Sequence, residues 1–267
     1  MTDRVSITYI DHVAHVEMVR EDKINALDMA MLDALNNAIA ELSQRPDIRA
    51  VVLSGRGRGF CAGLDLSNFA AMADKDKQAD VQQDSLMPRT HGIANKFQNV
   101  CIGWNKLPMP VISAAHAVCI GGGMHIFLGS DIRYAAPETK FSIMEIRWGL
   151  MPDMGSTPIL PHIARQDVVK ELTFTGRVFL TEEASQLGFV TKIEADPIAA
   201  ALETAQLIAS KNPQAIRAAK AIINEAPYIS EAEALLRESE LQEEIIGSQN
   251  QIEAVMAELE GRAAKFK

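Results

Sequence analysis

Three consecutive glycines, Gly121 to Gly123, separate a short apolar run from a helix-like segment in "AVCIGGGMHIFLGSDIRY". Glycine enters left-handed backbone at little steric cost, and it lets a second chain segment or a ligand approach the main chain closely. The first N–H groups of a helix also lack intrahelical acceptors and carry partial positive charge. The triplet therefore predicts a tight strand-to-helix turn, which either serves the fold alone or presents amide groups to a ligand.

A second glycine-bearing segment, "GRGRGFCAGLDLSNF", lies about 60 residues upstream and also follows a predicted strand, "RAVVLSG". Two corners of this kind can present two backbone N–H groups to one carbonyl oxygen, which is the architecture of an oxyanion hole. The triplet matches neither the G-x-G-x-x-G pattern of dinucleotide-binding turns nor a P-loop, so a nucleotide site is not predicted there.

The hydrophobic periodicity of the first half predicts an α/β unit. Apolar and polar residues alternate over residues 4–19, as in a two-stranded hairpin, and a helix with Asp28 as its N-cap leads to a strand at residues 49–55. The polar segment 68–95 has weak periodicity and is predicted to be a loop or a marginal helix. A buried run at 111–120, the glycine turn, a helix and further strands repeat the pattern, so the fold class is α/β.

The last third of the chain is predicted to be helical. Ser230 and Glu233 have the spacing of a capping box at the start of one of these helices. No linker-like composition separates this part from the rest, so the boundary is soft. We place an α/β core at residues 1–200 and a helical region, which covers the core or joins subunits, at 201–267.

Composition excludes several classes of function. Among the 267 residues, 48% are hydrophobic and 23% charged, as in ordinary globular proteins. The net charge of −9 argues against a nucleic-acid partner. No apolar run approaches the roughly 20 residues of a membrane helix, and the first residues do not resemble a signal peptide, so no membrane association and a cytoplasmic location are expected. Cys61, Cys101 and Cys119 have no metal-site spacing and are interpreted as buried hydrophobic residues.

Three motifs together carry a family resemblance. "FCAGLDL", "AAHAVCIGGGMHI" and "DIRYAAPETKFSIMEIRWGLMPDMG" occur in the order and at the spacing of the crotonase (enoyl-CoA hydratase/isomerase) superfamily, which the chain resembles over most of residues 5–195. The resemblance implies a crotonase-like fold of repeated strand-strand-helix units with a helical C-terminal region. It also implies an acyl-CoA thioester substrate, a homo-oligomer that is a trimer or a dimer of trimers, and no cofactor or metal beyond the coenzyme A of the substrate.

The same resemblance assigns binding positions. By the family pattern, the backbone N–H groups of Leu64 and Gly122 form an oxyanion hole around the thioester carbonyl, where fixed amide donors stabilise enolate charge. The adenine and phosphate end of coenzyme A would lie along "DKINAL" and "CAGLD". The matching CoA-binding positions are Lys23, Ala26, Ala62 and Asp65.

The acidic positions depart from the hydratase pattern. Hydratases carry glutamate at the positions of both His125 and Glu145, and this chain keeps only Glu145. Its apolar surroundings predict a desolvated carboxyl with a raised pKa, suited to general acid/base catalysis, although it could instead pair with Arg147 at the surface. Asp153 matches an acidic position of the dienoyl-CoA isomerases and the nucleophile of related dehalogenases. It could also cap a helix after Pro152.

His125 has three interpretations: a core histidine bonded to a neighbour, a titratable replacement for the missing acid, or a group that holds Asp153 or a water in place. The other histidines are expected to be structural. These are His12, His15, His91, His116 and His162.

Isomerisation of a dienoyl-CoA through a thioester enolate ranks first among the functions, with Glu145 as the principal acid/base and Asp153 and His125 as partners. Hydration of an enoyl-CoA is the main alternative. Thioester hydrolysis, with Asp153 as nucleophile or His125 activating water, ranks lower. A non-catalytic CoA-binding or assembly protein is the alternative from outside catalysis. The sequence does not identify the acyl chain.

Overall fold

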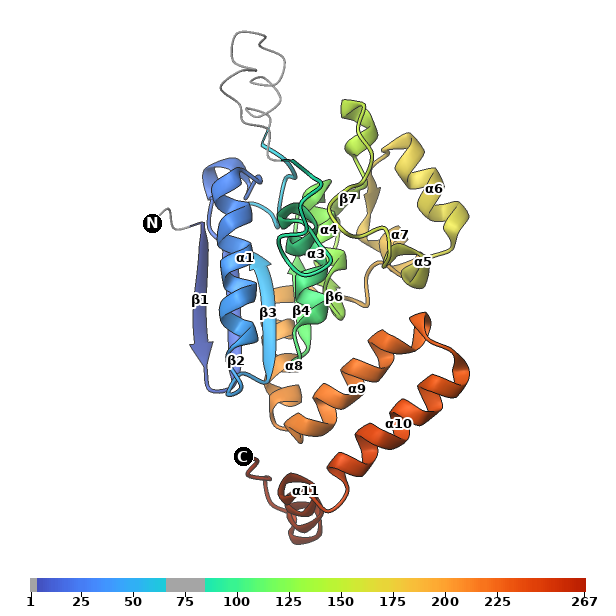
Figure 1. The fold of residues 1–267 in the computed structure, drawn as a ribbon. Coiled ribbons are helices and arrows are strands. Elements are labelled where there is room, and N and C mark those ends of the chain that lie inside the picture. The colour runs from blue at the N-terminus through green and yellow to red at the C-terminus, as the bar shows by residue number, and fades with distance from the viewer. Residues whose placement is uncertain (1–3, 66–84) are drawn as a thin grey trace.

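A computed structural model describes residues 4–65 and 85–267 and has a six-stranded sheet at its centre (Figure 1). The strand order is β1-β2-β3-β4-β6-β9. The first two strands form the predicted antiparallel hairpin and the remaining pairs are parallel. The strands are β1 (Val5–Ile10), β2 (Val13–Met18), β3 (Ala50–Gly55), β4 (Val111–Ala115), β6 (Ile132–Ala135) and β9 (Lys192–Ile193).

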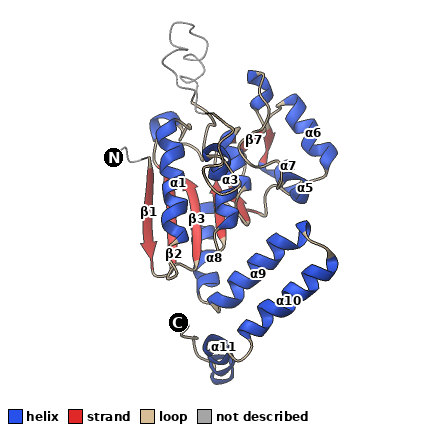
Figure 2. Ribbon diagram, viewed as in Figure 1, coloured by secondary structure: helices blue, strands red, loops and turns tan. Residues whose placement is uncertain are grey.

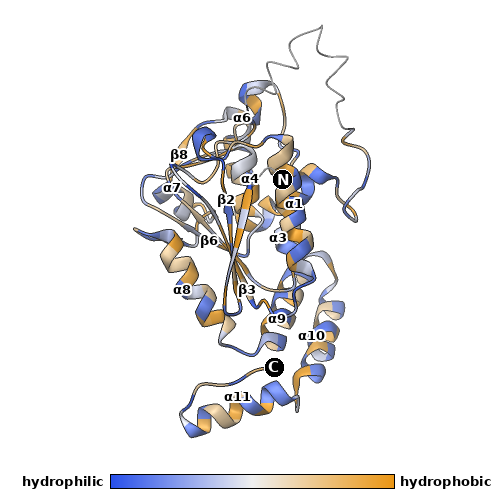
Figure 3. Ribbon diagram, turned by 90° about the vertical axis from the view of Figure 1, so that its left-hand side faces the viewer, coloured by the Kyte–Doolittle hydropathy of each residue, from blue (hydrophilic) through white to orange (hydrophobic). Residues whose placement is uncertain are grey.

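Helices cover both faces of this sheet. On one side lie α1 (Met29–Ser43), α3 (Lys96–Lys106) and α4 (Gly122–Leu128), and on the other lies α8 (Pro197–Ala209), as Figure 3 shows. The side chains of a strand alternate between the two faces. In β3, Val51 and Leu53 therefore pack in the core with α1, whereas Val52 packs against the alanines of α8. Double coverage explains why β3 is buried along its whole length.

A second, three-stranded sheet has the order β5-β7-β8. Its strands are β5 (Val118–Ile120), β7 (Lys140–Ser142) and β8 (Phe179–Leu180). The apolar run predicted at 111–120 is therefore two strands in different sheets, because the chain turns at Ala117, whose φ is 53°. Three short helices surround this sheet (Figure 2). They are α5 (Leu160–Ile163), α6 (Gln166–Thr175) and α7 (Thr181–Gln186).

The 3₁₀ turns of the described residues are η1 (Glu21–Lys23), η2 (Glu145–Trp148) and η3 (Ala226–Tyr228), the last of which follows α9. The predicted N-cap is confirmed, since Asp28 accepts a hydrogen bond from the Met31 N–H. The capping box of Ser230 and Glu233 is also confirmed. Of the predicted loop at 68–95, residues 68–84 lie outside the described residues, and 85–95 lead irregularly into α3.

Helices α9 (Pro213–Glu225), α10 (Glu231–Ile245) and α11 (Gln249–Glu260) extend below the sheet in Figure 1. The predicted boundary after residue 200 falls inside α8, which packs on the sheet, so the helices outside the core begin with α9. Leu235 and Leu236 on α10 are exposed in the single chain. The trimer or dimer of trimers stays a prediction. No helix among the described residues is both long and apolar enough to span a membrane.

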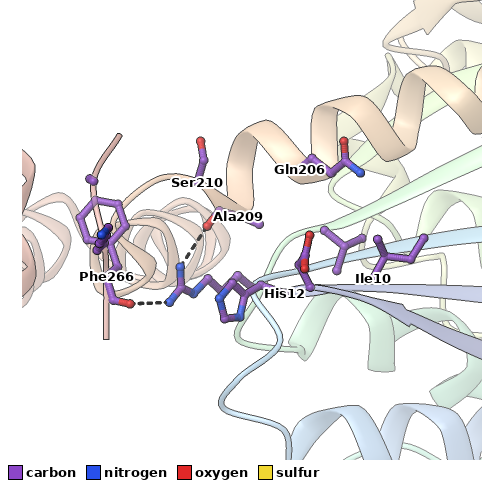
Figure 4. A pocket seen from close by; sticks show the side chains of 11 residues that line it. Ile10, His12, Gln206, Ala209, Ser210 and Phe266 are labelled. Atoms are coloured by element: carbon purple, nitrogen blue, oxygen red, sulfur yellow. Dashed lines mark hydrogen bonds between the residues drawn. The ribbon is translucent and has the colours of Figure 1, made fainter. Parts of the chain in front are cut away.

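The end of the chain returns to the sheet. Arg49 donates hydrogen bonds to the carbonyl oxygens of Ala209 (3.3 Å) and Phe266 (3.0 Å), the dashed lines of Figure 4. These bonds tie the C-terminal residues to the end of α8, around a cavity of about 470 Å³ that also borders the β1–β2 turn. None of the predicted site residues lines this cavity. The cavity is therefore separate from the predicted site.

One buried ion pair attaches α9 to the core. The Lys220 ammonium lies 2.8 Å from Asp131 Oδ2 and donates to the Met109 carbonyl oxygen (2.9 Å). Both side chains are largely shielded from solvent, at 7% and 18% exposure. Breaking such a pair from one side leaves an uncompensated buried charge, which costs more than the pair itself contributes.

Replacing Lys220 by methionine is expected to lower the free energy of unfolding by about 3 kcal/mol, because Asp131 loses its partner inside the protein. Urea denaturation followed by circular dichroism measures this. Exposed Lys211 provides the control, and Lys211→Met should leave the midpoint nearly unchanged. Equal midpoints for the two variants would show that the ion pair does not anchor α9.

Candidate active site

The two glycine corners lie side by side. The Cys61 N–H donates to the Val118 carbonyl oxygen (3.0 Å), and the Ile120 N–H donates to the Cys61 carbonyl oxygen (3.1 Å). These bonds form an isolated parallel bridge between Cys61 and Cys119. The "FCAGLDL" motif is thus joined along its backbone to the strand that ends in the glycine triplet. The three cysteines are buried and free as predicted, and burial raises the pKa of the Cys61 thiol to about 12.

Each glycine of the triplet meets a different constraint. Gly121 has a φ of 51°, which side chains other than that of glycine rarely adopt. A Cβ on Gly123 would lie 2.6 Å from Cys61 Cβ and 2.8 Å from the Cys61 carbonyl oxygen, so this position carries the close approach of the two corners. A Cβ on Gly122 would meet only the side-chain ends of Leu27 and Met154. The backbone conformation therefore explains glycine at position 121, and close packing explains it at position 123. Neither constraint is as strong at position 122.

The backbone amides predicted to form an oxyanion hole are available. Within the described part of the chain, neither Leu64 nor Gly122 donates its N–H to another protein group. Leu27 bonds to the Gly63 carbonyl oxygen (2.8 Å) and accepts from the Asp65 N–H (3.0 Å). In a parallel bridge this pattern turns the N–H of Leu64 away from Leu27. Both corners thus keep one amide free to donate.

The predicted CoA-binding positions surround the same corner. Lys23 ends η1 and is exposed, while Ala26 is buried and Ala62 partly buried. The Ala62 N–H donates to the Ile24 carbonyl oxygen (2.9 Å), which ties the two segments together. The carboxylate of Asp65 is buried and lies 2.6 Å from the Arg20 guanidinium. Its side chain is thus part of the framework, and any contact of Asp65 with a coenzyme would use its backbone.

Asn25 organises this corner and was not singled out from the sequence. Its side-chain N–H groups donate to the carbonyl oxygens of Arg56, Gly59 and Phe60, and its Oδ1 accepts from the Arg20 N–H. The residue is fully buried with a left-handed φ of 55°. Asparagine tolerates that conformation better than most residues. The signal in the sequence was one asparagine between apolar neighbours in "KINAL".

Glu145, the first residue of η2, lies beside the glycine turn. Its Oε1 is 3.0 Å from His125 Nε2 and 3.4 Å from the point where a Cβ on Gly121 would lie. Its other oxygen, Oε2, is buried and has no hydrogen-bond partner among the described residues. An unsatisfied buried acceptor costs free energy. One oxygen is thus fixed by the protein, and the other keeps its capacity to accept a hydrogen bond.

The predicted raised pKa of Glu145 is wrong. Burial does raise it, but the hydrogen bond from His125, and the charge of His125 whenever it is protonated, outweigh burial and hold the pKa of Glu145 below its usual value. The alternative surface pairing with Arg147 does not occur, since that guanidinium turns to Met144 Sδ. A glutamate of this kind stays ionised at neutral pH.

Asp153 lies in the loop that follows Pro152, where no helix begins, so it is not an N-cap. Partial burial of the carboxyl raises the pKa of Asp153, the charge of Glu145 raises it further, and His125 opposes both effects. His125, Glu145 and Asp153 therefore form one electrostatic cluster. Carboxyl groups whose pKa values move in opposite directions are suited to divided roles as acid and base.

His125 is fully buried near the start of α4, and both ring nitrogens are engaged. Nε2 contacts Glu145, and Nδ1 lies 2.6 Å from the Oγ of Ser156, a residue that no sequence motif indicated. Other histidines bind backbone or serine, as expected for structural residues: His12 contacts the Asp47 carbonyl oxygen and His15 contacts Ser54. Among the described residues no cluster of three or more His, Cys, Asp or Glu side chains is arranged to hold a metal ion.

Comparison with known proteins gives consistent matches. A family model described as "Enoyl-CoA hydratase/isomerase" matches residues 9–267. The chain is 33% identical over 258 residues to the human "Delta(3,5)-Delta(2,4)-dienoyl-CoA isomerase, mitochondrial", covering 95% of this chain and 78% of that protein. A peroxisomal protein of the same description from Arabidopsis thaliana is 28% identical over 257 residues, covering 95% and 92%. The crystal structure of an enoyl-CoA hydratase from Bacillus anthracis superposes with a TM-score of 0.86 at 29% identity, covering 99% of both chains.

The close approach at Gly123 predicts that Gly123→Ala destabilises the protein by about 2 kcal/mol, because the new methyl overlaps the Cys61 backbone. Gly122→Ala is the matched control, since its methyl would meet only movable side-chain ends. Urea denaturation of both variants measures the difference. If the two alanines cost the same, the two corners are not packed as described.

Replacing His125 by leucine removes the hydrogen-bond donor beside Glu145 but keeps the burial. We expect the pKa of Glu145 to rise above its usual value, which ¹³C NMR titration of labelled glutamate carboxyls detects, with Glu145→Gln identifying the signal. In the wild type, the contact stabilises the folded state at pH values above the pKa of an unfolded glutamate. This stabilisation is lost as the pH falls through the lower pKa that Glu145 has in the folded protein. His125→Gln retains a side-chain N–H and should keep part of the low pKa. A Glu145 signal that titrates alike in wild type and His125→Leu would contradict the contact.

Proposed function

The chain belongs to the enoyl-CoA hydratase/isomerase family and has its crotonase-like α/β fold, and from this premise we propose that it moves the double bonds of a dienoyl-CoA thioester. The observation that carries the proposal is the electrostatic pair of Glu145 and Asp153, whose pKa values move in opposite directions, with His125 at the position of a second glutamate. The names of the human and Arabidopsis relatives, both dienoyl-CoA isomerases, support it. Their names place them in mitochondria and peroxisomes, and a cytoplasmic location for this chain stays a prediction.

The proposed reaction needs two proton-transfer groups and no second substrate. In a 3,5-dienoyl-CoA a proton leaves C2 and its bonding pair, held as the thioester enolate, forms the C2–C3 double bond. The C3–C4 pair then becomes the C4–C5 double bond, and the C5–C6 pair takes up a proton at C6 to give the 2,4-dienoyl isomer. Substrate and product contain the same atoms, so neither water nor a redox partner is consumed. One group must accept a proton and a second must donate one.

The residues fit these roles in order along the substrate. The amides of Leu64 and Gly122 would bind the thioester oxygen and stabilise it as enolate charge develops. Glu145 lies next to Gly121 and is therefore close to the thioester end, where its carboxylate would take the C2 proton. Asp153, whose pKa is raised, would donate the proton at C6. His125 would hold Glu145 rather than react.

The alternatives fit less well. Hydration in this family employs a second carboxylate where this chain has His125, and both nitrogens of His125 contact protein side chains. Activation of a hydrolytic water by His125 meets the same obstacle. A purely CoA-binding role would not explain why the pKa values of Glu145 and Asp153 are shifted in opposite directions.

Purified protein is expected to convert a 3,5-dienoyl-CoA into its 2,4 isomer, followed by the ultraviolet absorbance of the diene conjugated to the thioester. Glu145→Gln and Asp153→Asn should each lower kcat by a factor of about 100 or more, because each removes one proton-transfer group. Glu138→Gln, a change at an exposed carboxylate in the turn before β7, is the control and should leave kcat unchanged.

Competing activities are tested with the same preparation. Rapid hydration of crotonyl-CoA without isomerisation would overturn the ranking in favour of the hydratase, and release of free thiol would favour hydrolysis. Exchange of the C2 proton in deuterated water that persists in Asp153→Asn but not in Glu145→Gln would support the assignment of Glu145 as the base. The reverse pattern would exchange the two roles.

A further inference from the structure

Three side chains far apart in the sequence form one hydrogen-bonded row. Ser156 Oγ lies 2.6 Å from His125 Nδ1, and His125 Nε2 lies 3.0 Å from Glu145 Oε1. Ser156 and His125 are both fully buried, and the Glu145 side chain is 13% exposed. The row therefore runs from the interior of the protein to the glycine turn, and Glu145 is its outer member.

The direction of the hydrogen bonds follows from donor and acceptor counting. Within the described residues the hydroxyl of Ser156 contacts no acceptor other than His125 Nδ1. If Nδ1 carried a proton and donated it, the hydroxyl hydrogen would be buried without a partner, which costs free energy. Ser156 therefore donates to a bare Nδ1. The single ring proton then lies on Nε2, which donates to Glu145 Oε1.

We propose that Ser156 is a positioning residue for proton transfer: its hydroxyl fixes His125 as the neutral Nε2–H tautomer, and His125 in turn orients the Glu145 carboxylate with Oε2 toward the substrate. The inference rests on the proposed function only in assigning Glu145 as the base. A neutral donor holds the carboxylate in place without the full charge of an imidazolium. A cation at the same distance would weaken the base that it orients.

The row contains the same residue types as a hydrolytic triad, serine, histidine and acid. The ends are reversed, however, because here the acid and not the serine lies at the exposed end. In a triad the serine contacts the substrate and the acid is buried behind the histidine. Here Ser156 is the buried end, and Glu145 lies beside Gly121. Ser156 has no route to a thioester carbon in this arrangement, so it acts through His125 rather than as a nucleophile.

The titratable groups that act on this row are few. Glu145 on η2 and Asp153 in the following loop both interact electrostatically with His125. Cys61 and Cys119 border the same turn, and burial raises the pKa of both thiols, so they remain neutral there. The groups that act on His125 are thus two carboxyls and one hydroxyl.

The tautomer is read directly by ¹⁵N NMR of histidine-labelled full-length protein, with His125→Gln identifying the His125 signals. The wild type is expected to show a protonated Nε2 and a bare, hydrogen-bonded Nδ1 at neutral pH. Ser156→Ala should release this state and give a second tautomer. A protonated Nδ1 in the wild type would overturn the proposal, and this result does not depend on any substrate.

Kinetics separates positioning from a structural role. Ser156→Ala is expected to lower kcat for the 3,5-dienoyl-CoA about tenfold with KM within about twofold, and to alter the pH profile, because Glu145 then loses its fixed neutral donor. Ser156→Thr keeps the hydroxyl and should recover most of kcat. Unchanged kcat and pH profile in Ser156→Ala would refute the role.

Ser54 supplies the matched control, since its hydroxyl is also buried and bonds a histidine, His15 Nε2, at 2.8 Å on β3. Ser54→Ala should leave the His125 signals, kcat and the pH profile unchanged. Loss of isomerase activity in both serine variants would indicate a folding effect and overturn the specific role of Ser156. Thiol release that Ser156→Ala abolishes would instead make Ser156 a nucleophile.

Discussion

The backbone bridge between Cys61 and Cys119 is the contact on which the site depends. It joins a segment after β3 to β5 in the second sheet, and it thereby holds side by side the two glycine corners that contain the free amides of Leu64 and Gly122. The bridge forms only because Gly123 has no side chain where the Cys61 backbone passes. A pair of hydrogen bonds and one missing methyl group thus determine whether two distant glycine turns make a single site.

Buried polar groups hold this arrangement from behind. Asn25 satisfies three carbonyl oxygens of the loop after β3, and Arg20 pairs with Asp65 at 2.6 Å. Buried charges and amides are costly unless their partners are complete, so such a network tolerates few alternative conformations. These contacts offset the free-energy cost of left-handed backbone at Ile24 and Asn25. Hydrogen bonds and ion pairs therefore fix the corner as much as close packing does.

Local patterns predicted the hairpin, the Asp28 cap and the α/β class, because each depends on residues near one another in the sequence. The division of residues 111–120 between two sheets depends on the backbone angle of Ala117, for which the composition held no signal. The direction of the pKa shift at Glu145 was predicted wrongly, since apolar neighbours in sequence indicate burial but not the histidine 20 residues away. The sequence did not indicate Ser156 for the same reason, because its contact with His125 arises only from the packing of the folded chain.

Glu145 and Asp153 both lie between β7 and α5, in a stretch that belongs to neither sheet and contains only one 3₁₀ turn. The amides proposed to bind the thioester oxygen come instead from corners tied into the strands. The framework and the proposed reactive groups are thus encoded in separate parts of the chain. Substitutions in this stretch can redirect the reaction while the scaffold persists, which is the kind of divergence that lets a single ancestral fold give rise to enzymes with different products.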